Sequence, residues 1–437
     1  MGRFTLINPW QTHSTDKDAA PGRPKGAARK GISLMKYIIV IGDGMSDRPV
    51  EALGGRTPLE VARKPVLDAL AAKAEVGLVR TTPHGAEPGS DTAHLCLLGY
   101  DPRVCYTGRS PLEALGLGVA VEKGDTVFRC NLVTFSPRGD YANWEMTDHS
   151  AGKITTGEAK TLLRAIGDAL GGDGLEFHPG VSYRHLMLWK GGCSPVTLRP
   201  PHDLLGKAIG DHLPQGEDAG RLRELMRKSY DILSAHPVNA KRERRGLRPA
   251  NSIWLWGEGT SPDLEDFEKK FGVRASVISA VPLVKGIGRG AGMSVIEVEG
   301  ATGELNTNYE GKVVAAISAL RNGDFVLLHL EAADECGHDG LTEEKVKAIE
   351  LLDSRILAPL TSALDKGKEP YRLIVMPDHS TPLCVRTHTP EPVPYLLYDS
   401  TRALSHNAPL YSERAAAATG LLIDDGTALM PRLLQRT

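Results

Sequence analysis

The sequence lacks three features that would each indicate a particular class of protein. Its six cysteines include no C-x-x-C pair, which argues against a disulfide framework and is typical of reduced cytoplasmic thiols. Its longest apolar runs have the length of a strand and fall far short of the about 20 residues of a membrane span. Its net charge is −2, from 52 Lys and Arg against 54 Asp and Glu, so no excess of positive charge favours binding to nucleic acid or anionic membranes. We therefore expect a cytoplasmic globular protein that binds neither.

The composition is that of a folded protein with more than one domain. The chain has 437 residues, of which 41% are hydrophobic and 24% charged, and this length suggests two or three domains of about 150 residues. Residues 1–34 differ, because they are polar, rich in Gly, Ala and Lys, and lack the apolar segment of a secretory signal. We expect them to form a poorly ordered N-terminal extension.

Four short apolar runs predict strands: residues 37–41 (YIIVI), 325–330 (FVLLHL), 373–376 (LIVM) and 393–398 (VPYLLY). The first three are almost continuous β-branched or aliphatic runs, which is typical of strands buried on both faces of a sheet. Helical patterns lie between the strands, at residues 56–72, 311–321 and 344–364, and Pro65 is expected to break the first of them. Strands that alternate with helices predict an α/β protein with a parallel sheet.

Polar residues gather where these strands begin or end. Asp43 follows the first strand, Asp334 and His338 follow the second, Asp378 and His379 follow the third, and His388 stands just before the fourth. Because the chemistry of open α/β sheets gathers at the carboxyl ends of the strands, we expect these side chains at one edge of the sheet. Each short motif is weak alone, and their coincidence at separately predicted strand ends is the stronger signal.

The middle of the chain predicts a second domain. Residues 113–262 contain more Gly, Pro and Arg, with their clearest apolar runs at 183–189 and 252–257. The strand-end motifs resume after this segment. We predict a discontinuous catalytic domain of residues 35–112 and 263–437, with a substrate-binding domain of residues 113–262 inserted into it. The basic run 241–249 has no interleaved aromatic residues, so we expect a solvated loop there.

The residues at the predicted sheet edge are of the types that bind divalent cations. Asp334 and His338 are four residues apart, which puts them on one side of a helical turn where they can share a cation. One set of ligands would be Asp334, His338 and His388, and the other would be Asp43, Asp378, His379 and Ser90. Mixed nitrogen and oxygen ligands suit Zn, Mn or Mg and do not distinguish among them.

Ser90 opens an apolar helical run in the segment EPGSDTAHLCLLGYD, residues 87–101. A serine at this position is often only a helix N-cap. A serine hydroxyl can also be a nucleophile when a cation activates it, and the N-terminus of a helix favours a phosphoryl group on that oxygen. His94, four residues further on, would face the same side of the helix.

Together these segments resemble a known family. IGDGMSD, PGSDTAHLCLLGYDP, YTGRSPLEALG, FRCNLVT, EAADECGHDG, MPDHSTP and RTHTPEPVP are similar to motifs of the archaeal-type cofactor-independent phosphoglycerate mutases, which belong to the alkaline phosphatase superfamily. The similarity spans roughly residues 35–437. It implies an alkaline-phosphatase-like, mostly parallel sheet with helices on both faces and an inserted α/β domain that binds the glycerate part of the substrate. It also implies that Ser90 accepts the phosphoryl group and that the two ligand sets each hold a metal ion.

The activity implied by the resemblance is the interconversion of 3-phosphoglycerate and 2-phosphoglycerate through a phosphoserine, without bisphosphoglycerate. Such a substrate carries a phosphate and a carboxylate, which basic and polar side chains must hold. The candidates are His94, Arg129, Asn131, Arg184, His185, Arg248, Asn251 and Lys285, with Asp148 and His149 as acid or base groups.

Two other functions remain open on the sequence. One is a metal-dependent phosphotransferase or phosphatase that acts on another small phosphoester. A homoserine-kinase-like role is an example, because segments such as TDHSAGKITTGEAK are similar to a bacterial branch for which that role has been suggested. The other is a binding protein that has lost the chemistry. That function predicts missing ligands, and none of the seven ligand residues is missing.

Overall fold

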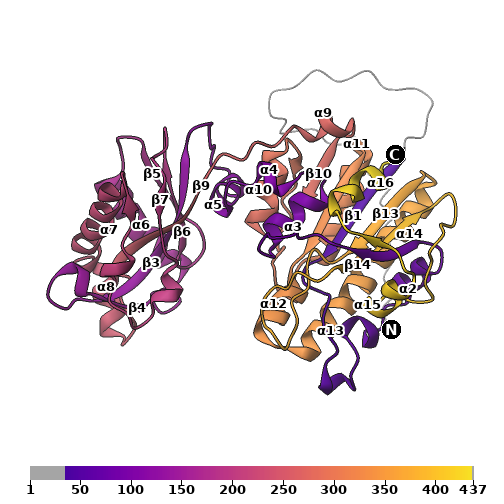
Figure 1. Cartoon of the computed structure of the whole chain (residues 1–437), viewed down its shortest axis with the longest axis horizontal. Coiled ribbons are helices and arrows are strands. Elements are labelled where there is room, and N and C mark those ends of the chain that lie inside the picture. The colour runs from indigo at the N-terminus through magenta and orange to yellow at the C-terminus, as the bar shows by residue number, and fades with distance from the viewer. Residues whose placement is uncertain (1–34, 436–437) are drawn as a thin grey trace, which may run out of the picture. The chain divides into compact units, whose positions relative to one another are not determined.

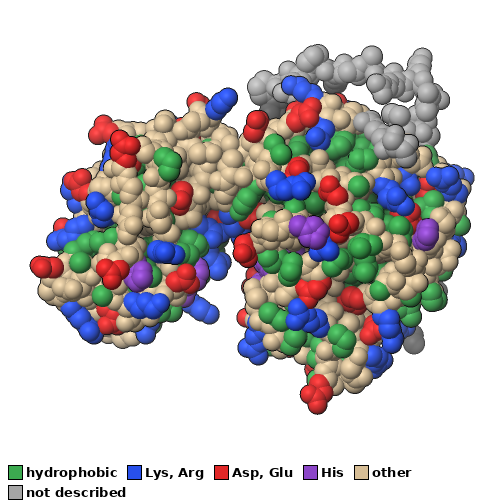
Figure 2. All heavy atoms as spheres, viewed as in Figure 1, with side chains coloured by type: hydrophobic (Ala, Val, Ile, Leu, Met, Phe, Trp, Pro, Cys, Tyr) green, Lys and Arg blue, Asp and Glu red, His purple; other side chains and the backbone are tan. Residues whose placement is uncertain are grey.

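The computed structural model describes residues 35–435, and Figure 1 shows their helices and strands. The predicted extension of residues 1–34 lies outside the described residues. Within residues 35–435, no helix is long and apolar enough to cross a membrane. Charged side chains of both signs are mixed over the face seen in Figure 2, in keeping with the net charge of −2.

An eight-stranded sheet carries the four predicted strands. Its order is β11 (Ser294–Val295), β10 (Ala275–Ile278), β12 (Phe325–Leu330), β1 (Lys36–Gly42), β13 (Tyr371–Met376), β14 (Val393–Asp399), β2 (Glu75–Val79) and β15 (Leu422–Ile423). β10, β12, β1 and β13 are parallel, whereas β14 is antiparallel to both β13 and β2. The predicted α/β class with a mostly parallel sheet is confirmed. Because β14 runs the opposite way, the loop that precedes it, with His388, lies at the edge where the parallel strands end.

Helices cover both faces of this sheet. Alternate residues of β1 belong to separate apolar clusters, with Ile38 and Val40 on one face and Ile39 and Ile41 on the other. The first cluster includes residues of α2 (Pro65–Ala71), α11 (Tyr309–Asn322), α13 (Thr342–Leu351) and α14 (Ala358–Gly367). The second includes residues of α3 (Ser90–Leu97), α9 (Phe267–Phe271), α10 (Pro282–Gly290) and α16 (Leu429–Leu433). Burial on both faces explains the unbroken apolar runs of the central strands.

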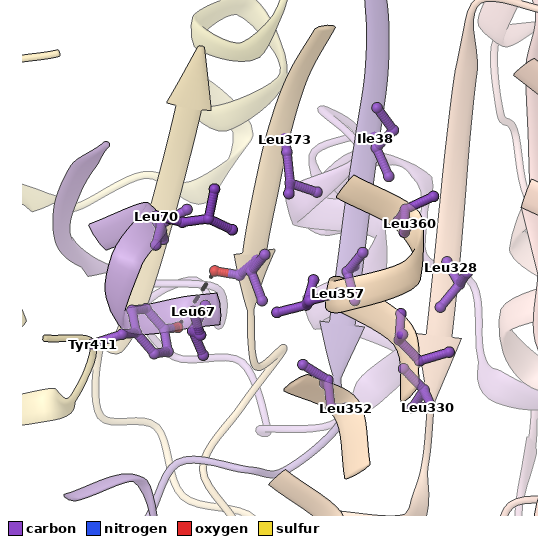
Figure 3. Packing of buried hydrophobic residues seen from close by; sticks show 14 of the residues in the cluster. Ile38, Leu67, Leu70, Leu328, Leu330, Leu352, Leu357, Leu360, Leu373 and Tyr411 are labelled. Atoms are coloured by element: carbon purple, nitrogen blue, oxygen red, sulfur yellow. Dashed lines mark hydrogen bonds between the residues drawn. The ribbon is translucent and has the colours of Figure 1, made fainter. Parts of the chain in front are cut away.

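Figure 3 shows the packing of the first cluster, where Leu352, Leu357 and Leu360 lie over the strand residues Ile38 and Leu328. The helical pattern predicted at 344–364 is α13 and α14, joined by a π-helical turn over Leu352–Leu357. The pattern predicted at 56–72 is broken as expected, into α1 (Pro58–Val61) and α2, with Pro65 at the first position of α2. Proline suits that position because its missing N–H would have no helical partner there.

A second, five-stranded sheet is built from residues 126–260. Its long central strand β3 (Thr126–Ser136) pairs antiparallel with β4 (Glu145–Asp148), β6 (Arg184–Trp189) and β9 (Ser252–Thr260), and β5 (Leu175–His178) pairs with β6. The helices α6 (Thr156–Leu170) and α7 (Ala219–Ser234) pack against Phe128, Cys130 and Leu132 of β3. Since strand side chains alternate, Arg129 and Asn131 lie on the opposite face. The domain boundaries at residues 113 and 262 stay a prediction.

The remaining α-helices and strands have at most eight residues each. They are α4 (Pro102–Cys105), α5 (Arg109–Gly116), α8 (Pro237–Arg244), α12 (Ala332–Asp339), α15 (Glu413–Ala418), β7 (Val196–Thr197) and β8 (Gln215–Gly216). The predicted solvated loop at 241–249 is partly wrong, because α8 extends to Arg244 and buries Arg242. Arg242 donates to Glu158 and to the Ala151 and Arg248 carbonyls, and these partners offset the cost of burying its charge.

Lys345 on α13 provides a stability prediction. Its side chain is fully buried, and Nζ lies 2.7 Å from both Asp47 Oδ2 and the Thr381 carbonyl. Replacing it with Met leaves the Asp47 carboxylate buried without its cation, so Lys345→Met is expected to lower the free energy of unfolding by about 3–5 kcal/mol. Urea denaturation measures this. Lys347→Met, on the exposed side of the same helix, is the control and is expected to change stability by less than about 0.5 kcal/mol. Equal midpoints for the two variants would contradict the prediction.

Candidate active site

Ser90 is the first residue of α3, and its side chain does not cap the helix. Gly89 occupies the N-cap position and has no side chain, and the first-turn amide of Thr92 donates to the Asp91 carboxylate at 2.9 Å rather than to Ser90. The Ser90 hydroxyl instead lies 3.1 Å from His379 Nε2. The structure therefore excludes the helix-cap interpretation of Ser90 and brings its hydroxyl to a histidine 289 residues away in the sequence.

Asp43 and Asp378 lie beside this pair. His379 Nε2 is 3.5 Å from Asp43 Oδ1 and 3.3 Å from Asp378 Oδ2. Both of these carboxylate oxygens are buried and have no hydrogen-bond partner within the described residues. The other Asp378 oxygen accepts the Gly44 amide at 3.2 Å, which orients the carboxylate. Ser90, Asp43, Asp378 and His379 are thus together, as the sequence predicted.

The second predicted set also comes together. His338 Nε2 and His388 Nε2 lie 3.0 Å apart, and they are 3.3 Å and 3.6 Å from the two oxygens of Asp334. Asp334 and His338 lie on α12, one turn apart, whereas His388 comes from the loop before β14. Asp334 also has an oxygen within 4.8 Å of ligating atoms of Asp43 and His379. It therefore stands between the two predicted sets.

Burial and nearby negative charges disfavour the ionised forms of Asp43 and Glu331, whereas hydrogen bonds from His338 and His388 outweigh burial and lower the pKa of Asp334. Burial, with the charges of Asp378, Glu331 and Asp334, raises the pKa of Asp43 well above its usual range. Burial, with Asp334 beside it, raises the pKa of Glu331 to about 8. Divalent cations would supply the missing positive charge. The oxygens of Asp43 and Asp378 that lack partners, and the paired imidazole nitrogens beside Asp334, form a donor set that fits such cations.

The sequence reasoning missed two side chains of the site, His329 and Glu331. His329 Nε2 lies 2.8 Å from Asp43 Oδ2, and its Nδ1 lies 3.1 Å from Ser279 Oγ. Glu331 Oε2 is buried 3.6 Å from His329 Nε2 and has no hydrogen-bond partner within residues 35–435. A signal was present, because His329 is the one polar residue in the apolar run of residues 325–330. The contact of His329 with Asp43 could not be predicted from this signal, because it depends on the pairing of β12 with β1.

His94 was predicted among the substrate-binding residues, and the structure buries it completely. Its Nδ1 lies 2.7 Å from the Ser90 carbonyl and 3.4 Å from Asp378 Oδ2. Its Nε2 is buried without a hydrogen-bond partner among the described residues. A buried ring presents no atom at the surface, so in this structure His94 supports the turn that carries Ser90.

Arg129 and Asn131 lie on the face of the small sheet opposite its core. The Arg129 guanidinium contacts Glu113 through two nitrogens, at 2.5 Å and 3.1 Å, and lies 4.8 Å from the ring centroid of Trp256. Asn131 accepts from Trp256 Nε1 at 3.0 Å and donates to the His149 carbonyl at 3.2 Å. These contacts hold a basic and an amide side chain side by side on one face.

Asp148 and Arg248 shape the loop that carries His149. Asp148 accepts from the amide and hydroxyl of Ser150 and from the Gly152 amide, at 2.7–2.9 Å, and pairs with Arg248 at 2.7 Å. The His149 ring makes edge contacts with Tyr183 and His202, at centroid distances of 5.8 Å and 6.2 Å. Its Nδ1 is buried and has no hydrogen-bond partner in the described part of the chain.

The other candidates have varied surroundings. Arg184 is exposed and lies over the Tyr183 ring. His185 is buried and accepts the Gly180 amide, and burial lowers its pKa to about 4. Both polar groups of Asn251 bond the Phe135 backbone, which makes Asn251 part of the sheet. Lys285 on α10 pairs with Glu297 at 2.5 Å. Substrate binding by these residues stays a prediction.

Asp148 provides a prediction about pH. Burial alone would raise the pKa of Asp148, but the hydrogen bonds from Ser150, Arg248 and Gly152 outweigh it and lower the pKa to about 2. The value in the unfolded chain is about 3.9. A carboxyl group whose pKa is lower in the folded than in the unfolded chain stabilises the fold at pH values above the unfolded-state pKa. This stabilisation is lost as the pH falls from about 4 to about 2. Asp148→Asn is therefore expected to be less stable than wild type at about pH 6, with a difference that shrinks towards about pH 3.

Urea midpoints at both pH values measure this effect. Asp231→Asn is the control, because that exposed carboxylate has a single ion pair, with Arg227 on the same helix. A difference between wild type and Asp148→Asn that stays constant with pH would contradict the assignment.

A mostly parallel sheet with a serine hydroxyl among imidazole and carboxylate groups, at the edge where its strands end, defines an α/β enzyme with a candidate metal centre. The profile of the 2,3-bisphosphoglycerate-independent phosphoglycerate mutases matches residues 71–239. A Geobacter sulfurreducens protein named as a probable 2,3-bisphosphoglycerate-independent phosphoglycerate mutase is 50% identical over 403 residues, covering 92% of this chain and 100% of the relative. The enzyme of that name from Methanosarcina barkeri is 46% identical over 383 residues, covering 87% and 95%. The chain belongs to the 2,3-bisphosphoglycerate-independent phosphoglycerate mutase family.

Two solved structures have the same fold. The PH0037 protein from Pyrococcus horikoshii superposes with a TM-score of 0.79 at 31% identity, covering 92% of this chain and 98% of that one. The cofactor-independent phosphoglycerate mutase from Thermoplasma acidophilum superposes with a TM-score of 0.65 at 28% identity, covering 92% and 99%. The resemblance that the sequence motifs carried is confirmed.

Proposed function

We propose that the protein interconverts 3-phosphoglycerate and 2-phosphoglycerate through a phosphoserine at Ser90, without bisphosphoglycerate. The position of Ser90 carries this proposal. Its hydroxyl lies 3.1 Å from His379 Nε2, at the first residue of α3, and is not used as a helix cap. Amide groups in the first turn of a helix favour a phosphoryl group at that end. The names of the curated relatives support the same activity.

Two divalent cations belong to the proposal, one held by Asp43, Asp378, His379 and Ser90, the other by Asp334, His338 and His388. When bound, they would lower the pKa of the Ser90 hydroxyl and offset the negative charge of the phosphoryl oxygens. The ligand types suit Mn, Zn or Mg. The buried carboxylate oxygens without partners support this assignment.

The transfer proceeds in two displacements at phosphorus. Ser90 Oγ attacks, the bond between phosphorus and the glycerate oxygen breaks, and that oxygen gains a proton as the serine hydroxyl loses one. The glycerate then turns, and its other hydroxyl attacks the phosphoserine, which restores the Ser90 hydroxyl and releases the isomer. Both displacements are balanced in protons, so the reaction consumes no acid or base overall and takes its phosphoryl group from the substrate.

His149 is the better of the two predicted acid–base groups for the glycerate hydroxyls. Asp148 is committed to four hydrogen bonds that favour its ionised form, and its low pKa makes it a weak base. The His149 ring is half-buried, and its Nδ1 has no hydrogen-bond partner within the described residues, so the ring is not committed in the way that Asp148 is. Arg129 and Asn131, on the same sheet face, and the exposed Arg184 offer donors suited to a carboxylate.

A coupled assay tests the proposal. 3-Phosphoglycerate is supplied without bisphosphoglycerate, and 2-phosphoglycerate is measured by its conversion to phosphoenolpyruvate with added enolase. Sustained turnover is expected. Release of inorganic phosphate alone, or phosphorylation of homoserine by ATP without mutase turnover, would instead identify the phosphatase or phosphotransferase alternative.

A further inference from the structure

Thr381 lies between the two ligand sets and belongs to neither. Its side chain is fully buried. Its hydroxyl oxygen lies 2.5 Å from Asp334 Oδ1 and 3.2 Å from His379 Nδ1. Asp334 belongs to one proposed set and His379 to the other, so a single hydroxyl contacts a ligand of each.

The chemistry of these groups gives the hydrogen bonds a direction. A carboxylate can only accept, so the one proton of the Thr381 hydroxyl is donated to Asp334. The hydroxyl oxygen can then only accept from His379, which requires the proton of that imidazole to be on Nδ1. Nε2 of His379 is thereby left with its lone pair, facing Ser90 Oγ at 3.1 Å and Asp378 Oδ2 at 3.3 Å.

We propose that Thr381 is a positioning residue that holds His379 in the Nδ1–H tautomer, orients Asp334, and so links the two cation-binding sets. The link between cations rests on the proposed function, whereas the tautomer of His379 does not. Groups that bond the far side of a ligand commonly set its tautomer and orientation in this way.

The backbone around Thr381 makes room for this arrangement. A Cβ at Gly44, whose φ is +59°, would lie 2.6 Å from both Thr381 Oγ1 and Asp334 Oδ1. A Cβ at Gly337 would lie 2.5 Å from the Thr381 carbonyl oxygen. That carbonyl also accepts from Lys345 Nζ at 2.7 Å. Both glycines therefore leave room for Thr381, and the buried lysine holds its carbonyl in place.

Three variants of the full-length protein test the proposal. Thr381→Val keeps the shape of the side chain and removes the hydroxyl, whereas Thr381→Ser keeps the hydroxyl. Thr361→Val is the control. Thr361 on α14 is also buried, and its hydroxyl donates to the backbone carbonyl of Leu357. Imidazole ¹⁵N NMR of cation-free protein reports the His379 tautomer, with the signal assigned by its loss in His379→Asn. Titration with Mn²⁺, followed by EPR of the free ion, reports the affinity of each site.

Thr381→Val is expected to lose the single Nδ1–H tautomer and to bind at least one Mn²⁺ about 10–100-fold more weakly. Thr381→Ser and Thr361→Val are expected to match wild type in both measurements. A wild-type tautomer and affinity in Thr381→Val, or a Thr381→Ser variant that behaves like Thr381→Val, would overturn the inference. If wild type binds no Mn²⁺ and the tautomer still changes only in Thr381→Val, the role of Thr381 in holding His379 stands and the proposed cation function fails.

Discussion

Ser90→Ala is expected to lose mutase activity by on the order of 10³–10⁶-fold while retaining a cooperative fold. The covalent route has no substitute once Oγ is gone, because the phosphoryl group has no other acceptor in the proposed reaction. The stability change should be small, since the side chain caps no helix and makes one hydrogen bond, to His379. Losing one such bond costs about 0.5–1.5 kcal/mol. Turnover in the coupled assay and the thermal melt measure the two effects.

Ser229→Ala is the matched control for this experiment. Ser229 is fully buried on α7, where its hydroxyl donates to the Met226 carbonyl at 2.7 Å and accepts from the Ile253 amide at 2.9 Å. Its removal is expected to cost at least as much stability as Ser90→Ala, because the Ile253 amide also loses its acceptor, and to leave turnover unchanged. Wild-type protein quenched in acid with ³²P-labelled substrate should carry label on the peptide that contains Ser90. A Ser90→Ala variant that turns over at the wild-type rate would contradict the phosphoserine route.

Removal of divalent cations is expected to abolish activity, and Mn, Zn or Mg added back singly should restore it. Among the described residues, the one side chain that hydrogen-bonds the Ser90 hydroxyl is His379, which is itself a proposed ligand. The charges of Asp378 and Asp334 also disfavour the ionised form of Asp43 when no cation is present. Cation binding should therefore raise the melting temperature, and a free concentration 100 times the Kd stabilises a protein by about 2.7 kcal/mol.

Dialysis against a chelator, followed by titration with each cation, measures both effects. Asp334→Asn is the internal control, because it removes the carboxylate that stands between the two sets. Chelation should change the melting temperature of this variant less than that of wild type. Full turnover in protein stripped of metal would exclude the two-cation proposal, whatever the behaviour of the variant.

The parts of the fold that could be predicted are those in which the local sequence of apolar and polar residues indicates which side chains are buried. The runs at residues 325–330 and 373–376 form strands within a residue or two of their expected ends, because both faces of β12 and β13 are covered by helices. The break at Pro65 follows from the missing N–H of proline. The loop expected at 241–249 was partly wrong, since the partners that bury Arg242 lie elsewhere in the sequence, one of them at Glu158.

The sequence by itself determined the α/β class, the family and the set of ligand-type residues, because each of these follows from periodicity or from short motifs read in order along the chain. Only the tertiary structure decided what the individual side chains contact. His329 meets Asp43 across 286 residues, and Thr381 meets Asp334 across 47. The residue type of Ser90 allowed either a helix cap or a nucleophile. The structure excludes the cap, because Gly89 occupies the N-cap position of α3. The physical reason is that strand order and direction set these contacts. β1 pairs with β12 and β13, which lie far from it in the sequence, and local patterns carry no information about which strands pair.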